Sequence, residues 1–133
     1  MVAMATAYNR YKEHDVMMAN PMELIVMLYN GCIKQLKLAK IAIDDKDVDK
    51  ANGSLQKAQD IVMELMMSLD MSYEVSKELM NLYEFMAHEI GQVNVTKNPA
   101  SIGPLVEMLT SLRDAWVQVQ KQTRMPAAQL SEN

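Results

Sequence analysis

The sequence has few of the residues that form turns, cross-links or strongly charged binding surfaces. Its 133 residues include one cysteine, four glycines and four prolines, and 17 acidic residues outnumber 13 basic ones. The single Cys32 excludes an intrachain disulfide and a multi-cysteine zinc site, which suits a reducing compartment. A net charge of −4 argues against nucleic-acid binding, which usually needs a basic patch. No run approaches the ~18 apolar residues of a membrane span, and residues 1–20 lack a signal-peptide core, so we expect a cytoplasmic protein without membrane insertion.

So few turn-forming residues in a half-apolar chain predict long helices with few connections. Asn20-Pro21 is typical of a helix start, and apolar residues follow at helical spacing to about Ile43. A second Asn-Pro pair, Asn98-Pro99, lies close to Gly103-Pro104 and leaves the start of the last helix open. Asp45 or Asp47 could cap the second helix, and Ser72 is a candidate cap for the third. Three further seams have the 3-4 spacing of a helical bundle: Val48–Leu69, Val75–Val93 and Ile102–Val119.

These patterns predict an all-α fold, an antiparallel up-down four-helix bundle over residues 20–125. Residues 1–19 are expected to form an N-terminal tail or cap that packs on the bundle. Residues 126–133 are expected to be a frayed C-terminal tail.

Few residues could carry chemistry. Glu84 and His88 are four apart on the polar side of the third predicted helix, whereas a di-iron bundle uses inward-facing Glu and His three apart. Cys32 shares a helix face with Leu28 and Leu36, where a free thiol is usually a small buried apolar group. We therefore predict no enzyme activity, no cofactor and no metal site. The alternative is a helical-bundle metal or redox protein that uses methionine and Cys32.

Fourteen methionines are the other unusual feature. Methionine can replace leucine in a helical core, or it can form a surface that adapts to a partner, and both interpretations stay open. Periodicity alone does not decide between ordinary exposed hydrophobic residues, a groove for an apolar helix or peptide, and a homodimer interface. The apolar side chains left over beside the seams include Met27, Ile61, Met63, Met67, Met80 and Tyr83.

Several short strings, in matching order and spacing, resemble the flagellin-specific export chaperone family, FliS. The resemblance extends from Tyr8 to about Gln120. Its strings are Tyr8-Asn9-Arg10-Tyr11, Asn20-Pro21-Met22-Glu23-Leu24, Met27-Leu28-Tyr29-Asn30-Gly31-Cys32-Ile33-Lys34, Lys57-Ala58-Gln59-Asp60-Ile61-Val62-Met63-Glu64-Leu65, Leu82-Tyr83-Glu84-Phe85-Met86 and Leu112-Arg113-Asp114-Ala115-Trp116.

The resemblance implies a bacterial cytosolic chaperone that binds the disordered C-terminal segment of flagellin and keeps flagellin monomeric until export. It implies as partners this flagellin segment and, for the loaded chaperone, a component of the flagellar type III export gate, and it leaves open whether a co-chaperone binds as well. In the family the partner wraps around the bundle in apolar grooves, and the N-terminal tail covers part of that surface. The partner-binding residues expected here are Tyr8, Tyr11, Met27, Ile61, Met63, Leu65, Met67, Met80, Tyr83 and Ala87.

Two further expectations concern individual side chains. Ile61 and Tyr83 lie beside the seams, so a charge at either position should weaken partner binding and leave the fold intact. Arg113 and Asp114 are adjacent in sequence and should bond neighbouring helices or helix ends rather than each other.

Overall fold

The computed structural model describes residues 21–123, which fold into four α-helices and a short 3₁₀ helix. No strand occurs in this range, so the predicted all-α bundle is confirmed. The predicted tails, residues 1–19 and 126–133, lie outside the described residues. The elements are α2 (Pro21–Asp44), α3 (Val48–Met67), α4 (Glu74–Thr96), η1 (Pro99–Ser101) and α5 (Ile102–Thr123).

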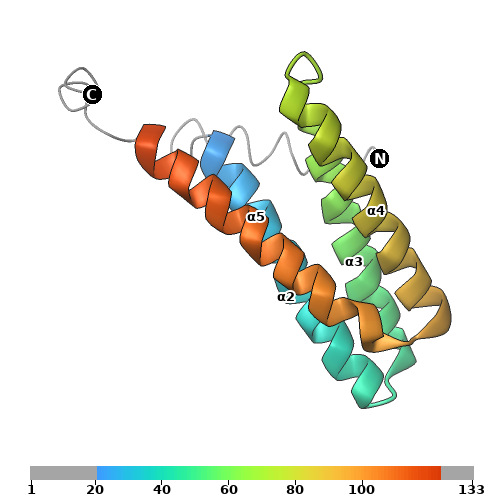
Figure 1. Ribbon diagram of the computed structural model, residues 1–133. Coiled ribbons are helices and arrows are strands. Elements are labelled where there is room, and N and C mark those ends of the chain that lie inside the picture. Colours follow the sequence, from blue (N-terminus) through green and yellow to red (C-terminus); the bar gives the residue numbers. More distant parts are fainter. Residues whose placement is uncertain (1–20, 124–133) are drawn as a thin grey trace.

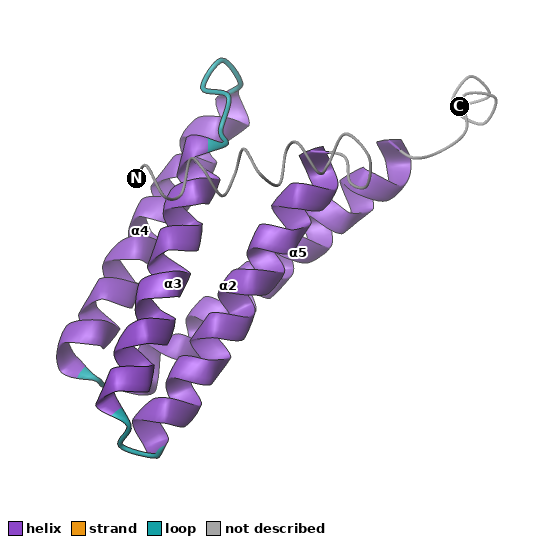
Figure 2. Ribbon diagram, turned by 180° about the vertical axis from the view of Figure 1, so that it is seen from behind, coloured by secondary structure: helices purple, strands orange, loops and turns teal. Residues whose placement is uncertain are grey.

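The helices do not all pack on one another. Helix α2 packs on α3 and on α5, α3 also packs on α4, and α4 and α5 make very few contacts. Figure 1 shows α4 and α5 meeting at the turn that joins them and then diverging. Seen from behind in Figure 2, the α3/α4 pair and the α2/α5 pair diverge toward the same end. We call this the open end; α2 begins there and α5 ends there.

The turn between α2 and α3 closes the opposite end. Lys46 adopts the left-handed conformation at φ 60°, its N–H donates to Ile43 O, and the N–H of Asp47 donates to Ala42 O at 2.8 Å. This is a Schellman ending, which satisfies carbonyls that the helix end leaves free. Asp47 then caps α3 by accepting a hydrogen bond from the backbone N–H of Lys50 at 3.1 Å. Of the two predicted caps, Asp47 is therefore the one used.

The start of α4 differs from the prediction, because Ser72 is not its cap. The helix begins after Tyr73, whose side chain makes no capping hydrogen bond. The backbone N–H and hydroxyl of Ser72 instead donate to Asp70 Oδ1 at 3.0 and 2.7 Å. These bonds lower the pKa of the Asp70 carboxyl. The Asp70 side chain thus stabilises the turn by hydrogen bonds to a nearby residue, as Asp commonly does in loops.

The Asn98-Pro99 pair does start a helical segment, but that segment is η1. Asn98 Oδ1 accepts a hydrogen bond from the N–H of Ala100 at 3.0 Å, and the chain continues directly into α5 at Ile102. Lys97, at φ 55°, ends α4 just before this turn and donates its N–H to Val93 O. The position of Ile102 resolves the start that the sequence left open.

The core is formed by the predicted seams of all four helices, except that the first seam residues of α3 and α4, Val48 and Val75, are 59% and 56% exposed. Cys32 is buried among them, and its thiol lies 3.6 Å from the carbonyl oxygen of Ala58, to which it donates. Burial raises the pKa of this thiol to about 12, so it is neutral and unreactive at physiological pH. The residues with no exposed surface include Leu36, Leu55, Val62, Leu65, Ile90 and Leu109.

The seam of α5 is buried only in its first half. Ile102, Leu105 and Leu109 are buried, whereas Leu112 and Trp116 are only partly so. The seam weakens because α5 diverges from α4 toward the open end (Figure 1), so α4 does not cover its second half.

Candidate partner-binding surface

Three aromatic side chains form a hydrogen-bonded group between helices near the middle of the bundle. The hydroxyls of Tyr29 on α2 and Tyr83 on α4 lie 2.5 Å apart, and Trp116 on α5 donates its indole N–H to Tyr29 Oη at 3.2 Å. Burial raises the pKa of both phenols. Because α4 and α5 make so few contacts, this group is a direct polar link that joins both of them to α2.

Two of the predicted partner-binding residues belong to the core. Tyr83 is 1% exposed and Leu65 is fully buried. The expectation that Tyr83 lies beside the seam is wrong, because its ring points inward and its hydroxyl is satisfied by Tyr29. A charge at Tyr83 would therefore destabilise the folded protein, so its effect on partner binding could not be separated from unfolding.

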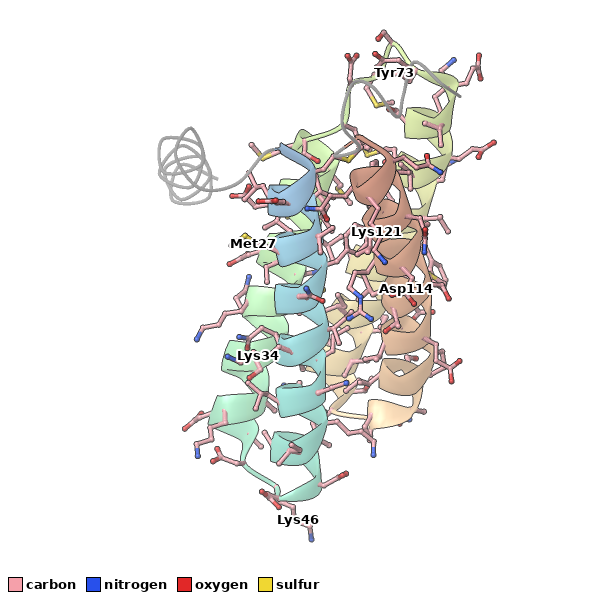
Figure 3. All side chains as sticks on the ribbon, turned by 90° about the vertical axis from the view of Figure 1, so that its left-hand side faces the viewer. Met27, Lys34, Lys46, Tyr73, Asp114 and Lys121 are labelled. Carbon is pink, nitrogen blue, oxygen red and sulfur yellow. The ribbon has the colours of Figure 1, made fainter. Side chains whose placement is uncertain are left out.

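Met27 and Ile61 lie on the outer face between α2 and α3. Met27 is 48% exposed and Ile61 partly buried. A Cβ placed on Gly31 would lie 3.4 Å from Ile61 Cδ1, so the two helices approach closely there. Figure 3 shows Met27 and Lys34 on the same side of α2, the side next to α3. Since the helices are antiparallel, Met27, one turn before Gly31, faces the turn of α3 that follows Ile61.

The other exposed candidates lie on the outer face between α3 and α4. Gln59 on α3 donates a hydrogen bond to the carbonyl of Ala87 on α4 at 2.9 Å, which fixes the register of these helices. Two turns closer to the open end, this register places Met67 opposite Met80. Met63 lies one turn before Met67 on α3 and is, like Met80, partly buried. The predicted residues thus occupy two outer faces rather than one groove, and Tyr8 and Tyr11 lie outside the described residues.

A third apolar surface, between α4 and α5, does not follow from the sequence pattern. Phe85 on α4 is 48% exposed and Val119 on α5 is 38% exposed. The prediction assumes that both helices bury their seams against each other, and here they diverge. The partly buried apolar side chains on these two helices are Leu82, Met108, Leu112 and Trp116.

Arg113 and Asp114 do pair with each other, contrary to expectation. Arg113 Nη2 lies 3.1 Å from Asp114 Oδ1, because the long guanidinium fork reaches sideways along the helix surface. Its Nη1 also donates to Asn30 Oδ1 on α2 at 3.0 Å, which is the interhelical bond that was expected. Within residues 21–123, no group of three His, Cys, Asp or Glu side chains could hold a metal ion.

Residues 4–123 match the family described as flagellar protein FliS. The chain belongs to the FliS family. It is 35% identical over 117 residues to the flagellar secretion chaperone FliS of Bacillus subtilis strain 168, covering 88% of each chain. It is 30% identical over 103 residues to that of Vibrio cholerae, covering 76% of each.

A solved structure supports the fold. A crystal structure described as a flagellar chaperone from bacteria has a TM-score of 0.73 and 23% sequence identity, and it covers 89% of this chain and 98% of its own. Membership of the FliS family makes the protein a flagellar export chaperone rather than an enzyme. None of the helices in residues 21–123 is long and apolar enough to cross a membrane.

Proposed function

We propose that the protein binds the C-terminal segment of flagellin in the bacterial cytoplasm, prevents its premature polymerisation and delivers it to the flagellar export gate. The observation that carries the proposal is the distribution of exposed apolar side chains over a FliS-family bundle. Met27, Met67 and Phe85 are each about half exposed, and they lie on three different outer faces. A segment that wraps around the bundle could contact all three.

The chemistry of these faces suits a disordered client. Ordering such a segment costs several kcal/mol, so its affinity must come from extensive apolar burial. Methionine adapts its side chain to different partners without a fixed fit, which favours a surface that covers a long and varied sequence. Covering the apolar faces that flagellin uses in filament packing would keep it monomeric.

Calorimetry with a purified C-terminal flagellin fragment tests the proposal. We expect a one-to-one complex, a negative heat-capacity change from apolar burial and little weakening by salt, since the chain has no basic excess. Absence of a complex at tens of micromolar would contradict the proposal. Sedimentation without the fragment checks the alternative that these faces form a homodimer.

A charge placed on the α2/α3 face should separate binding from folding. Ile61→Asp is expected to weaken binding of the fragment at least tenfold, about 1.4 kcal/mol, while the helical circular dichroism signal remains. Val95→Asp is the matched control, because Val95 is 81% exposed at the end opposite the open end. Equal affinities for the two variants would exclude this face from the binding site.

The N-terminal tail and the delivery step complete the proposal. Tyr8 and Tyr11 are proposed to cover part of the apolar surface in the free protein. Removing residues 1–15 should then increase the binding of a hydrophobic dye without loss of helical signal. Delivery predicts that an export-gate component captures the chaperone–fragment complex and not the free chaperone. A co-chaperone is proposed as a further partner.

A further inference from the structure

The sulfur atoms of the chain are unequally accessible to an oxidant dissolved in water. Cys32 is the chain's single cysteine and is buried, and burial raises the pKa of its thiol to about 12. Peroxides react with an accessible thiolate, so this residue is protected both by its position and by its protonation. Peroxide that meets the folded protein is therefore left with the methionine thioethers.

The methionines themselves differ in exposure. Within residues 21–123, Met27, Met67 and Met71 are each about half exposed, whereas Met86 on α4 has no exposed surface. A dissolved oxidant reaches a thioether only where the side chain is accessible. The folded protein should thus offer three thioethers to peroxide and keep Met86 reduced.

Two of the three exposed methionines lie where the partner is proposed to bind. Met27 is on the outer face between α2 and α3, and Met67 is on the outer face between α3 and α4, where the helix register places it opposite Met80. Met71 lies beyond both faces, in the turn that joins α3 to α4. Oxidation of the first two would change both faces, and oxidation of Met71 would not.

We propose that oxidation of Met27 and Met67 by hydrogen peroxide regulates the binding of flagellin. The sulfur lone pair attacks one peroxide oxygen, a sulfur–oxygen bond forms, and the oxygen–oxygen bond breaks. The thioether is oxidised to a sulfoxide, and the peroxide is reduced to water. The proposal rests on the proposed function and adds a means of regulation to it.

The sulfoxide should weaken the complex because it places a polar oxygen in an apolar contact. A hydrogen-bond acceptor that an apolar partner covers loses its water and gains no donor, which costs binding free energy. The core keeps its packing, since Met86 is out of reach of the oxidant. Methionine sulfoxide reductases restore the thioether, so the loss of affinity should be reversible.

Peptide mass spectrometry of the full-length protein after peroxide treatment tests the chemistry. Met27, Met67 and Met71 should each gain one oxygen atom well before Met86, with the helical circular dichroism signal unchanged. Bound flagellin fragment should protect Met27 and Met67 and leave Met71 reactive. Oxidation of Met86 at the same rate, or loss of the helical signal, would overturn the proposal.

Calorimetry with untreated flagellin fragment, added after the peroxide has been removed, tests the effect on binding. The oxidised protein should bind roughly tenfold more weakly, and reductase treatment should restore the affinity. The double variant Met27→Leu/Met67→Leu should bind and keep its affinity after peroxide, because leucine has a similar volume and no sulfur. Met71→Leu is the matched control and should lose affinity after peroxide as the wild type does.

The outcomes separate this proposal from the proposed function. If the untreated wild type does not bind the fragment, the proposed function fails and its regulation with it. If the wild type binds equally well before and after oxidation, only the regulation is overturned. If the double variant loses as much affinity after peroxide as the wild type, other methionines carry the effect, and the assignment to Met27 and Met67 is wrong.

Discussion

The hydroxyl groups of Tyr29 and Tyr83 lie 2.5 Å apart on two helices that are not neighbours in sequence. Trp116 donates to the same Tyr29 oxygen from a third helix. One phenol of α2 thus holds both α4 and α5, which contact each other very little.

Removing one hydroxyl should weaken the link without unfolding the bundle. Tyr83→Phe is expected to cost about 0.5–1.5 kcal/mol, since Tyr29 keeps its bond from Trp116. Tyr83→Asp should unfold the protein, because a buried charge would have no partner. Urea titration followed by fluorescence of the single tryptophan measures both, and Tyr73→Phe, at a 63% exposed residue, is the control. A folded Tyr83→Asp variant would contradict the assignment of Tyr83 to the core.

Two leucines of the predicted seams should differ in their contribution to stability. Leu65→Ala is expected to cost about 2–5 kcal/mol, from lost burial and the cavity left behind. Leu112→Ala should cost clearly less, because Leu112 is only partly buried on the diverging half of α5. Denaturant unfolding of both variants checks the order, and equal losses would show that α5 is covered along its whole length.

Gly31→Ala should separate stability from binding. Alanine in a helix interior is more stable than glycine by about 0.5–1 kcal/mol, and the new methyl group would only touch Ile61 Cδ1 at 3.4 Å. The same methyl group would fill space on the α2/α3 face and should weaken binding of the flagellin fragment. Gly53→Ala is the matched control, since nothing lies within 4 Å of its Cβ position. Gly53→Ala should gain the same stability and keep the wild-type affinity for the fragment. Equal affinities for the two variants would argue against binding at Gly31.

Stability should fall in alkaline solution. Burial raises the pKa of the Cys32 thiol from 9.0 to about 12, so the unfolded chain loses this proton at a lower pH than the folded one. The contribution of this buried thiol to the free energy of unfolding is therefore fully present below pH 9 and is lost as the pH rises toward 12. The raised pKa values of Tyr29 and Tyr83 act in the same direction. Unfolding free energies measured from pH 7 to 11 should decline less steeply for Cys32→Ala, and an identical slope would contradict the burial of the thiol.

Most of the fold could be predicted from local patterns. The α3 seam and the Asp47 cap depend on residues close together in sequence, and the structure confirms the cap and the seam from Ala51 to Leu65, whereas Val48 is 59% exposed. The N-terminus of α4 was predicted less accurately. Ser72 bonds to Asp70 instead of capping the helix, and helical periodicity carries no information on these hydrogen bonds.

The site was harder to predict, because exposure depends on how helices pack. Tyr83 lies beside its seam on a helical projection, and only the position of Tyr29 on another helix makes it a core residue. The divergence of α4 from α5 exposes Phe85, and no spacing along either helix predicts that divergence.

The packing of α5 on α2 also has a consequence for synthesis on the ribosome. Helix α5 is the last of the described helices to be made, yet it packs mainly on the first of them, α2, rather than on its predecessor. At 5–20 residues per second, synthesis of residues 99–123 takes roughly 1–5 s. During that time α2 and α3 can already pair, while the side of α2 that α5 will cover has no partner. A protein proposed to cover the apolar surface of another chain therefore passes, in its own assembly, through a stage in which one side of its helix α2 is itself uncovered.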